Sequence, residues 1–88
     1  MTQNTANDKV EVRKEYYESG DLWYETPYVN GDIHGIVKVY YESGALLNEA
    51  PYVNGEIHGI MKAYDEDKAN IVCLALYDKG REVVYKKI

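Results

Sequence analysis

Short runs of alternating apolar and polar residues fill most of the chain, and turn residues separate the runs at regular intervals. The runs are rich in Val, Ile, Leu and Tyr and have the length of ordinary β-strands. The pattern predicts a meander of about seven antiparallel strands that pair in chain order. They are expected at residues 10–17, 22–29, 34–41, 46–53, 58–65, 70–78 and 81–88.

Two kinds of turn signal alternate between these runs. Asn-Gly at 30–31 and 54–55 favours a two-residue type I′ turn, which needs positive φ at both central residues. Glu-Ser-Gly at 18–20 and 42–44 indicates a three-residue hairpin loop with Gly in the left-handed conformation. Lys-Gly at 79–80 is expected to close the last hairpin.

The turns recur because the sequence itself repeats. Residues 16–39 and 40–63 align without a gap and are identical at 17 of 24 positions, so each forms one hairpin repeat. Residues 64–88 retain little of the pattern and suit a degenerate capping repeat. We expect one domain over residues 9–88, preceded by a flexible tail at residues 1–8.

The two turn types have different effects on the faces of a sheet. A two-residue turn exchanges odd and even positions between faces, whereas a three-residue loop does not. Each repeat therefore needs one compensating irregularity, and Gly35 and Gly59 are natural places for a β-bulge. A close backbone approach at these glycines, or a four-residue loop, would explain them equally well. Pro27 and Pro51 are expected where the ladder is irregular, because they lack an N–H group.

Aromatic residues are unusual in this chain, which has ten Tyr, one Trp and no Phe. A tyrosine combines an apolar ring with a hydroxyl that tolerates water, and so suits a thin sheet with half-covered faces. Tyr16, Tyr40 and Tyr64 recur at one period and are expected to stack across alternate strands.

The repeated unit, YYESGxLxxExPYVNGxIHGxxKxY, resembles the bacterial variant of the MORN repeat found in small proteins of the YwqK-type antitoxin family. Residues 64–88 depart from it, since they lack the Pro, His-Gly and Glu-Ser-Gly. The resemblance implies an all-β, single-layer array of hairpins built from units of about 24 residues. It also implies a protein-binding scaffold or antitoxin with no catalytic activity of its own.

Composition bounds the possible functions. A single domain of 88 residues buries too little surface for a large enclosed active site. Cys73 is the only cysteine, so it excludes an internal disulfide and fits a reducing compartment; we expect it to be a small buried apolar residue. The sequence shows neither a targeting segment nor an apolar run long enough to span a membrane. The expected location is cytoplasmic.

Candidate catalytic and metal-binding residues are few. His34 and His58 lie one repeat apart, hence about 9.6 Å across two strands, too far to share a zinc ion; a hydrogen bond across the hairpin is the expected role. Glu25 and Glu49 recur at the same spacing, but nothing in the sequence supplies a sugar cleft. We therefore expect a protein that is not an enzyme and binds no metal and no cofactor.

Acidic residues are concentrated in the repeats. Residues 15–67 contain eleven Asp and Glu against Lys38 and Lys62, whereas the two ends of the chain are net positive. A negative sheet would attract a basic partner and repel nucleic acid. The predicted function is an antitoxin, immunity or phage-type inhibitor that presents an acidic sheet surface to a basic protein, such as a nucleic-acid enzyme.

The predicted partner-binding residues are five acids and two aromatic anchors. Alternation along a strand should place the neighbouring Trp23 and Tyr24 on opposite faces, although both rings are replaced by smaller groups in the second repeat. The alternative function is a structural scaffold that assembles through sheet edges or an aromatic face, as a monomer or weak dimer. The predicted site consists of Asp21, Glu25, Asp32, Glu49, Glu56, Trp23 and Tyr24.

Overall fold

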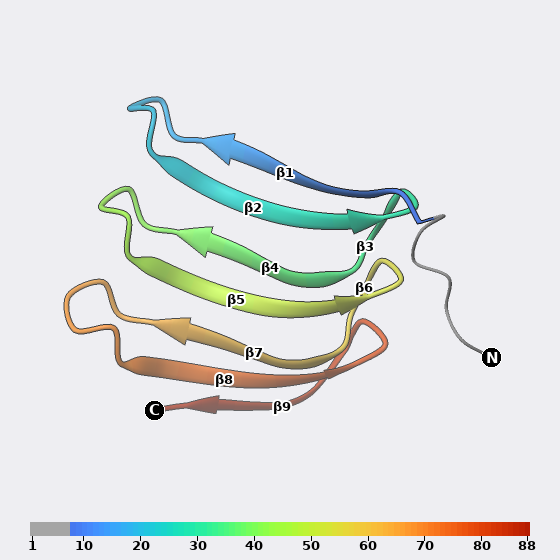
Figure 1. The fold of residues 1–88 in the computed structure, drawn as a ribbon. Helices are drawn as coiled ribbons and strands as arrows, with labels where there is room; N and C mark the ends of the chain where they lie inside the picture. Colours follow the sequence, from blue (N-terminus) through green and yellow to red (C-terminus); the bar gives the residue numbers. More distant parts are fainter. Residues whose placement is uncertain (1–7) are drawn as a thin grey trace.

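Residues 8–88 form one open antiparallel sheet without a helix, as the computed structural model in Figure 1 shows. The predicted all-β meander is therefore confirmed. Residues 1–7, which make up nearly all of the predicted tail, lie outside the described residues. No helix that could span a membrane occurs in the part of the chain that the structure describes.

The sheet contains nine strands rather than the seven predicted. Seven of them pair in the order β1-β2-β4-β5-β7-β8-β9, while the two-residue strands β3 and β6 pair with β2 and β5. β3 and β6 arise because the chain pairs for two residues after each Asn-Gly turn and then leaves the ladder at His34 or His58. The strands are β1 (Val10–Tyr16), β2 (Leu22–Val29), β3 (Asp32–Ile33), β4 (Gly35–Tyr40), β5 (Leu46–Val53), β6 (Glu56–Ile57), β7 (Gly59–Tyr64), β8 (Ile71–Asp78) and β9 (Arg81–Lys87).

Both predicted turn types are present. Asn30 and Gly31 have φ values of 52° and 91°, as the Asn-Gly turn requires. In the first Glu-Ser-Gly loop, Gly20 has a φ of 97°. The N–H of Tyr17 donates to the carbonyl oxygen of Asp21 at 2.8 Å, which closes a loop of three residues. The four-residue alternative is therefore excluded.

The compensating irregularity lies at Trp23, not at Gly35 as expected. Glu15 pairs with Tyr24, whereas the next residue, Tyr16, pairs with Leu22. Trp23 is thus an extra residue in β2, a one-residue β-bulge next to the three-residue loop. The same shift recurs in the β4–β5 and β7–β8 pairs. This bulge keeps equivalent residues of successive repeats on the same face.

A second irregularity surrounds each His-Gly pair. Tyr28 pairs with Ile33, and Glu25 pairs with Lys38. Between these two pairs the chain advances three residues along β2 but five residues from β3 to β4. The β3–β4 side therefore contains two extra residues. An even number of extra residues leaves the faces unchanged, so this irregularity does not compensate for the exchange of faces at the Asn-Gly turn.

The glycine of the His-Gly pair lies directly against a proline. Gly35 has a φ of 120°, and a Cβ atom there would lie 3.1 Å from Cγ of Pro27. The N–H of His34 donates to the carbonyl oxygen of Pro27 at 3.1 Å. The N–H and C=O of one strand residue point to the same side, so the N–H that Pro27 lacks would have faced this irregular part of the ladder. The predicted close approach at Gly35 and the predicted place of Pro27 are both correct.

The sheet is a single layer with a very small core. Thr26, Ala50 and Ala75 are the buried residues of the described chain, and they occupy equivalent positions in β2, β5 and β8. The Cα atoms extend over 44 × 34 × 17 Å. Large side chains are thus partly exposed on both faces, and Cys73 is half-buried rather than buried.

The predicted tyrosine stack is absent. Tyr40 pairs with Leu46 and Tyr64 with Ile71, so aliphatic side chains separate the rings of successive repeats. Among residues 8–88, the ring contacts instead involve Tyr17, Trp23 and Tyr24.

Candidate protein-binding surface

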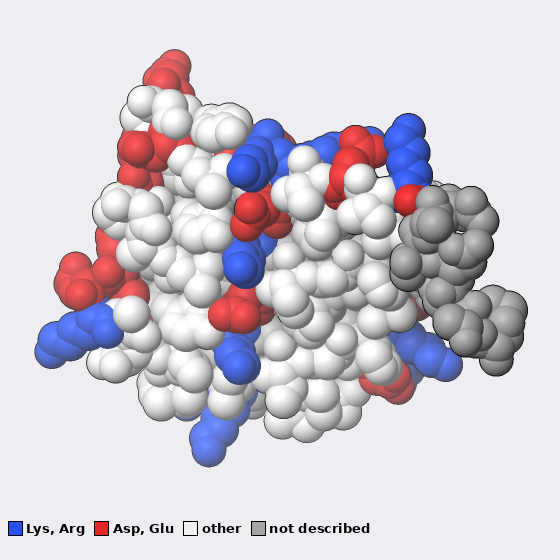
Figure 2. All heavy atoms as spheres, viewed as in Figure 1, with Lys and Arg blue, Asp and Glu red and all other residues white. Residues whose placement is uncertain are grey.

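Glu25 and Glu49 lie in the middle of one face of the sheet, each between two lysines. Lys14 and Lys38 are the direct cross-strand neighbours of Glu25, while Lys38 and Lys62 are those of Glu49. Figure 2 shows the result as a column of alternating blue and red across the face. We call these five residues the charge ladder and this side of the sheet the ladder face.

The ladder carboxylates are further tied to tyrosines of the following repeat. The Tyr40 hydroxyl donates to Glu25 at 3.4 Å, and the Tyr64 hydroxyl donates to Glu49 at 2.8 Å. The hydrogen bond to Glu49 raises the pKa of Tyr64, with partial burial adding to the increase. Because each carboxylate has cationic neighbours and a hydroxyl donor, the middle of the ladder face is not a uniformly acidic surface.

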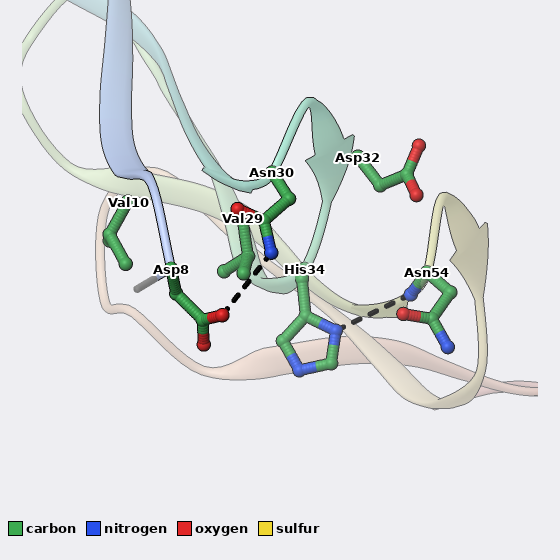
Figure 3. Close-up of a pocket in the computed structure, with 7 residues that line it drawn as sticks. All are labelled: Asp8, Val10, Val29, Asn30, Asp32, His34 and Asn54. Atoms are coloured by element: carbon green, nitrogen blue, oxygen red, sulfur yellow. Dashed lines mark hydrogen bonds between the residues drawn. The ribbon is translucent and has the colours of Figure 1, made fainter. Parts of the chain in front are cut away.

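Asp32 and Glu56 lie at another place, next to the Asn-Gly turns. We call this end of the sheet the turn edge. Here a depression of about 540 Å³ is lined by Asp8, Val10, Val29, Asn30, Asp32, His34 and Asn54 (Figure 3). The Asp32 carboxylate points away from the His34 ring in this view.

The histidines of the turn edge connect successive repeats. Nδ1 of His34 accepts a hydrogen bond from the N–H of Asn54 at 3.4 Å, and Nδ1 of His58 accepts one from the N–H of Lys79 at 3.1 Å. Each histidine therefore binds the turn of the next unit, whereas the sequence predicted a bond across its own hairpin. Among residues 8–88, no three His, Cys, Asp or Glu side chains are grouped so that they could hold a metal ion.

The strongest concentration of acids lies at the opposite end of the sheet. Three loops line up there, at residues 17–21, 41–45 and 65–70 (Figure 1), and we call this end the loop edge. Figure 2 shows red side chains gathered along it. Within these three loops one lysine, Lys68, accompanies six acidic residues, namely Glu18, Asp21, Glu42, Asp65, Glu66 and Asp67.

An aromatic cluster adjoins the loop edge. The ring centroids of Trp23 and Tyr24 are 4.7 Å apart in an edge-to-face arrangement, and those of Tyr17 and Trp23 are 5.5 Å apart. The bulge at Trp23 explains how neighbouring residues place their rings together, since the two residues oppose one residue of β1. The expectation that alternation separates these two rings is therefore wrong.

The acids of the loop edge lie close enough to affect the aromatic cluster. Partial burial raises the pKa of the Tyr17 hydroxyl, and the negative charges of Glu42 and Glu66 add to the increase. Tyr17 also donates its hydroxyl to the carbonyl oxygen of Tyr40 in the next repeat, which fixes the ring against the sheet. Trp23 remains 38% exposed.

The predicted site residues are thus divided among three places. Asp21, Trp23 and Tyr24 come together at the loop edge, whereas Glu25 and Glu49 belong to the charge ladder. The remaining two predicted acids lie at the turn edge. Sequence reasoning missed Tyr17 as a neighbour of Trp23, and it missed Glu42 and Glu66 as charges that act on the Tyr17 hydroxyl. Their positions in the aligned loops of successive repeats were the available signal.

Comparison with known proteins agrees with the hairpin repeats. The model of the MORN repeat variant matches residues 12–30 and 33–54, just under half of the chain. Each matched segment contains one hairpin with a Glu-Ser-Gly loop and ends at the Asn of an Asn-Gly turn. No curated protein and no solved structure matches the chain. Over its first two hairpins, the chain is similar to the MORN repeat variant, a repeat module.

Proposed function

We propose that this protein is a non-enzymatic binding module whose loop edge docks onto a basic surface of another protein and inhibits it, as an antitoxin or immunity protein does. The observation that supports the proposal is the gathering of six acids against one lysine beside a partly exposed tryptophan. Acids gathered at one edge steer a basic partner toward it, and buried aromatic side chains supply much of the affinity at interface centres.

The partner class follows from this charge. A basic protein surface, such as that of a nucleic-acid enzyme, complements the loop edge, whereas nucleic acid itself is repelled by it. Trp23 and Tyr24 would enter the centre of the contact, with Asp21, Glu42 and Glu66 at its rim. The turn edge and the ladder face remain available for other contacts.

The test uses the identified partner and a charge-reversed loop edge. Reversal of Glu18, Glu42 and Glu66 to Lys should reduce the association rate at least tenfold at low salt and much less at high salt, because ions screen charges at the rim. The control variant reverses Glu25, Asp32 and Glu49, which carry the same charge at other places. If only the control variant loses binding, the contact lies on the ladder face or turn edge and the proposal is wrong. Circular dichroism of both variants verifies that they fold.

A second candidate function is a structural module for assembly. The ladder face favours it, because a row of partly exposed apolar residues runs beside the charge ladder. An assembly through apolar packing should be insensitive to the salt concentration that weakens electrostatic docking.

A further inference from the structure

An apolar row runs across the ladder face, two residues away from the charge ladder. Val12 pairs with Pro27, Ile36 pairs with Pro51, and Leu76 pairs with both Ile60 and Val84. Ile36 and Ile60, near the middle of the row, are 43% and 52% exposed. The row consists of Val12, Pro27, Ile36, Pro51, Ile60, Leu76 and Val84.

The order of charges in the ladder makes the face complementary to itself. Lysine and glutamate alternate from β1 to β7, so a second ladder displaced by an odd number of strands brings opposite charges together. A ladder displaced by an even number of strands would instead oppose like charges. The face can therefore accept its own copy in a defined register.

From this charge complementarity we propose that two copies of the chain pack face to face through their ladder faces. The two-fold axis lies between the two sheets and runs parallel to the strands, at a point midway between β4 and β5. It places β4 over β5 of the other copy, β2 over β7, and β1 over β8. Such an interface uses the same surface of both copies, as two-fold dimers require. It places Lys38 opposite Glu49 of the second copy and Glu25 opposite Lys62 of the second copy.

The same rotation brings the two apolar rows together. It preserves position along the strands, so the row of one copy covers the row of the other, with Ile36 against Pro51 of the second copy at the centre. Sheets that pack face to face lie about 10 Å apart with nearly aligned strands, which suits this arrangement. The charged pairs would then fix the register of an apolar contact.

The ladder face is large enough for a stable dimer. The Cα atoms, those of the loops and turns included, extend over 44 × 34 Å, and a face within these bounds can hold the roughly 800 Å² that each partner contributes to a standard interface. The loop edges stay outside the contact, so the dimer would present two acidic edges. The inference does not depend on the proposed function.

The test begins with the mass of the full chain by sedimentation equilibrium. We expect twice the protomer mass of 10.1 kDa at micromolar concentration. Ile36→Lys should weaken the dimer at least tenfold, whereas Tyr85→Lys should leave it intact, because Tyr85 is 56% exposed and pairs with Ala75 on the other face. A monomeric wild type, or a dimer that survives Ile36→Lys, would overturn the proposal.

A charge swap tests the register. Lys38→Glu and Glu49→Lys should each be monomeric, because each places like charges across the axis. An equimolar mixture of the two should form a heterodimer, since both pairs then regain opposite charges. Glu42→Lys makes the same charge change in a loop, and its mixture with Lys38→Glu should yield no comparable heterodimer. Equal rescue by the Glu42→Lys variant would contradict the register, and so would a homodimer of either ladder variant.

Discussion

Gly35 and Pro27 approach each other so closely that a Cβ atom on Gly35 would lie 3.1 Å from Cγ of the proline. The pair recurs as Gly59 and Pro51, at 3.0 Å. In each repeat the chain leaves the ladder at this point and binds the turn of the next unit through the preceding histidine. The proline and the His-Gly pair thus act together to join one repeat to the next.

Gly35→Ala should destabilise the protein by about 2–4 kcal/mol, because it combines a strained positive φ with a clash against Pro27. Gly31→Ala is the matched control, since Gly31 has a φ of 91° but no atom within 4 Å of its Cβ position. Urea unfolding should show a clearly larger loss for Gly35→Ala. Adding Pro27→Ala should recover part of the difference. Equal losses at the two glycines would show that the close approach is unimportant.

The last repeat lacks both the proline and the His-Gly pair. Leu76 stands where Pro51 stands in the preceding repeat; it pairs with Val84 in β9, and the β8–β9 register shifts by one residue directly after it. The third unit therefore continues into β9 without the proline and the His-Gly pair that join the first two units to the next one.

His58→Ala should lower the free energy of unfolding by about 1 kcal/mol, because it removes the acceptor of the Lys79 N–H. Nδ1 of His58 also lies 3.5 Å from the exposed carboxylate of Asp78. Asp78→Asn separates the two contacts and should change stability little, since exposed ion pairs contribute little. Chemical denaturation of both variants measures the difference. A loss in Asp78→Asn as large as that in His58→Ala would assign the contribution to the contact with Asp78.

Stability should fall as the pH rises above 10, in part because of Tyr40 and Tyr64. Their folded-state pKa values are raised above the ordinary value of 10.0, mainly by burial at Tyr40 and by the hydrogen bond to Glu49 at Tyr64. The folded state therefore retains protons that the unfolded state loses, so this contribution is complete below pH 10 and is lost above it. Urea unfolding of Tyr40→Phe/Tyr64→Phe should show a shallower alkaline decline than the wild type.

One exposed phenol elsewhere serves as the control for that measurement. Tyr85→Phe removes a tyrosine from the edge strand β9 and should retain the alkaline decline of the wild type. An identical decline in the wild type and the double variant would show that neither burial nor the bonds to the ladder carboxylates hold these protons.

Trp23→Leu should separate binding from folding. Leu47 occupies the equivalent bulge in the second repeat, so the substitution places a residue there that the fold already accepts. We expect a stability change below about 1 kcal/mol and at least a tenfold loss of affinity for the basic partner, as for an interface hot spot. Calorimetric titration of the partner and thermal unfolding measure the two quantities. Unchanged affinity in a folded variant would remove Trp23 from the contact.

Much of the fold could be predicted from the turns and the period. Asn-Gly and Glu-Ser-Gly define the hairpins, because each needs glycine or asparagine at positive φ, and the hairpins set the strand order. Counting residues in the two turns also showed that one irregularity per repeat was required. Its position at Trp23 was not predictable, because a bulge can lie at any strand residue and glycine is only its commonest marker.

The site was less predictable because its members meet across strands. Trp23 and Tyr24 share a place only through the bulge, which alternation alone would not reveal. Glu25 and Glu49 looked like members of an acidic surface in the sequence, since their lysine neighbours are distant along the chain. Only the register shows that lysines stand on both sides of each carboxylate.

Comparative affinity capture can show whether the loop edge recognises a basic protein. Extracts of the organism that encodes the protein are passed over the wild type, the Glu18→Lys/Glu42→Lys/Glu66→Lys variant and the Glu25→Lys/Asp32→Lys/Glu49→Lys control, and the bound proteins are quantified by mass spectrometry. We expect at least one basic protein to be enriched by the wild type and by the control but lost with the loop-edge variant. Recovery of the same proteins by the wild type and the loop-edge variant would contradict this expectation.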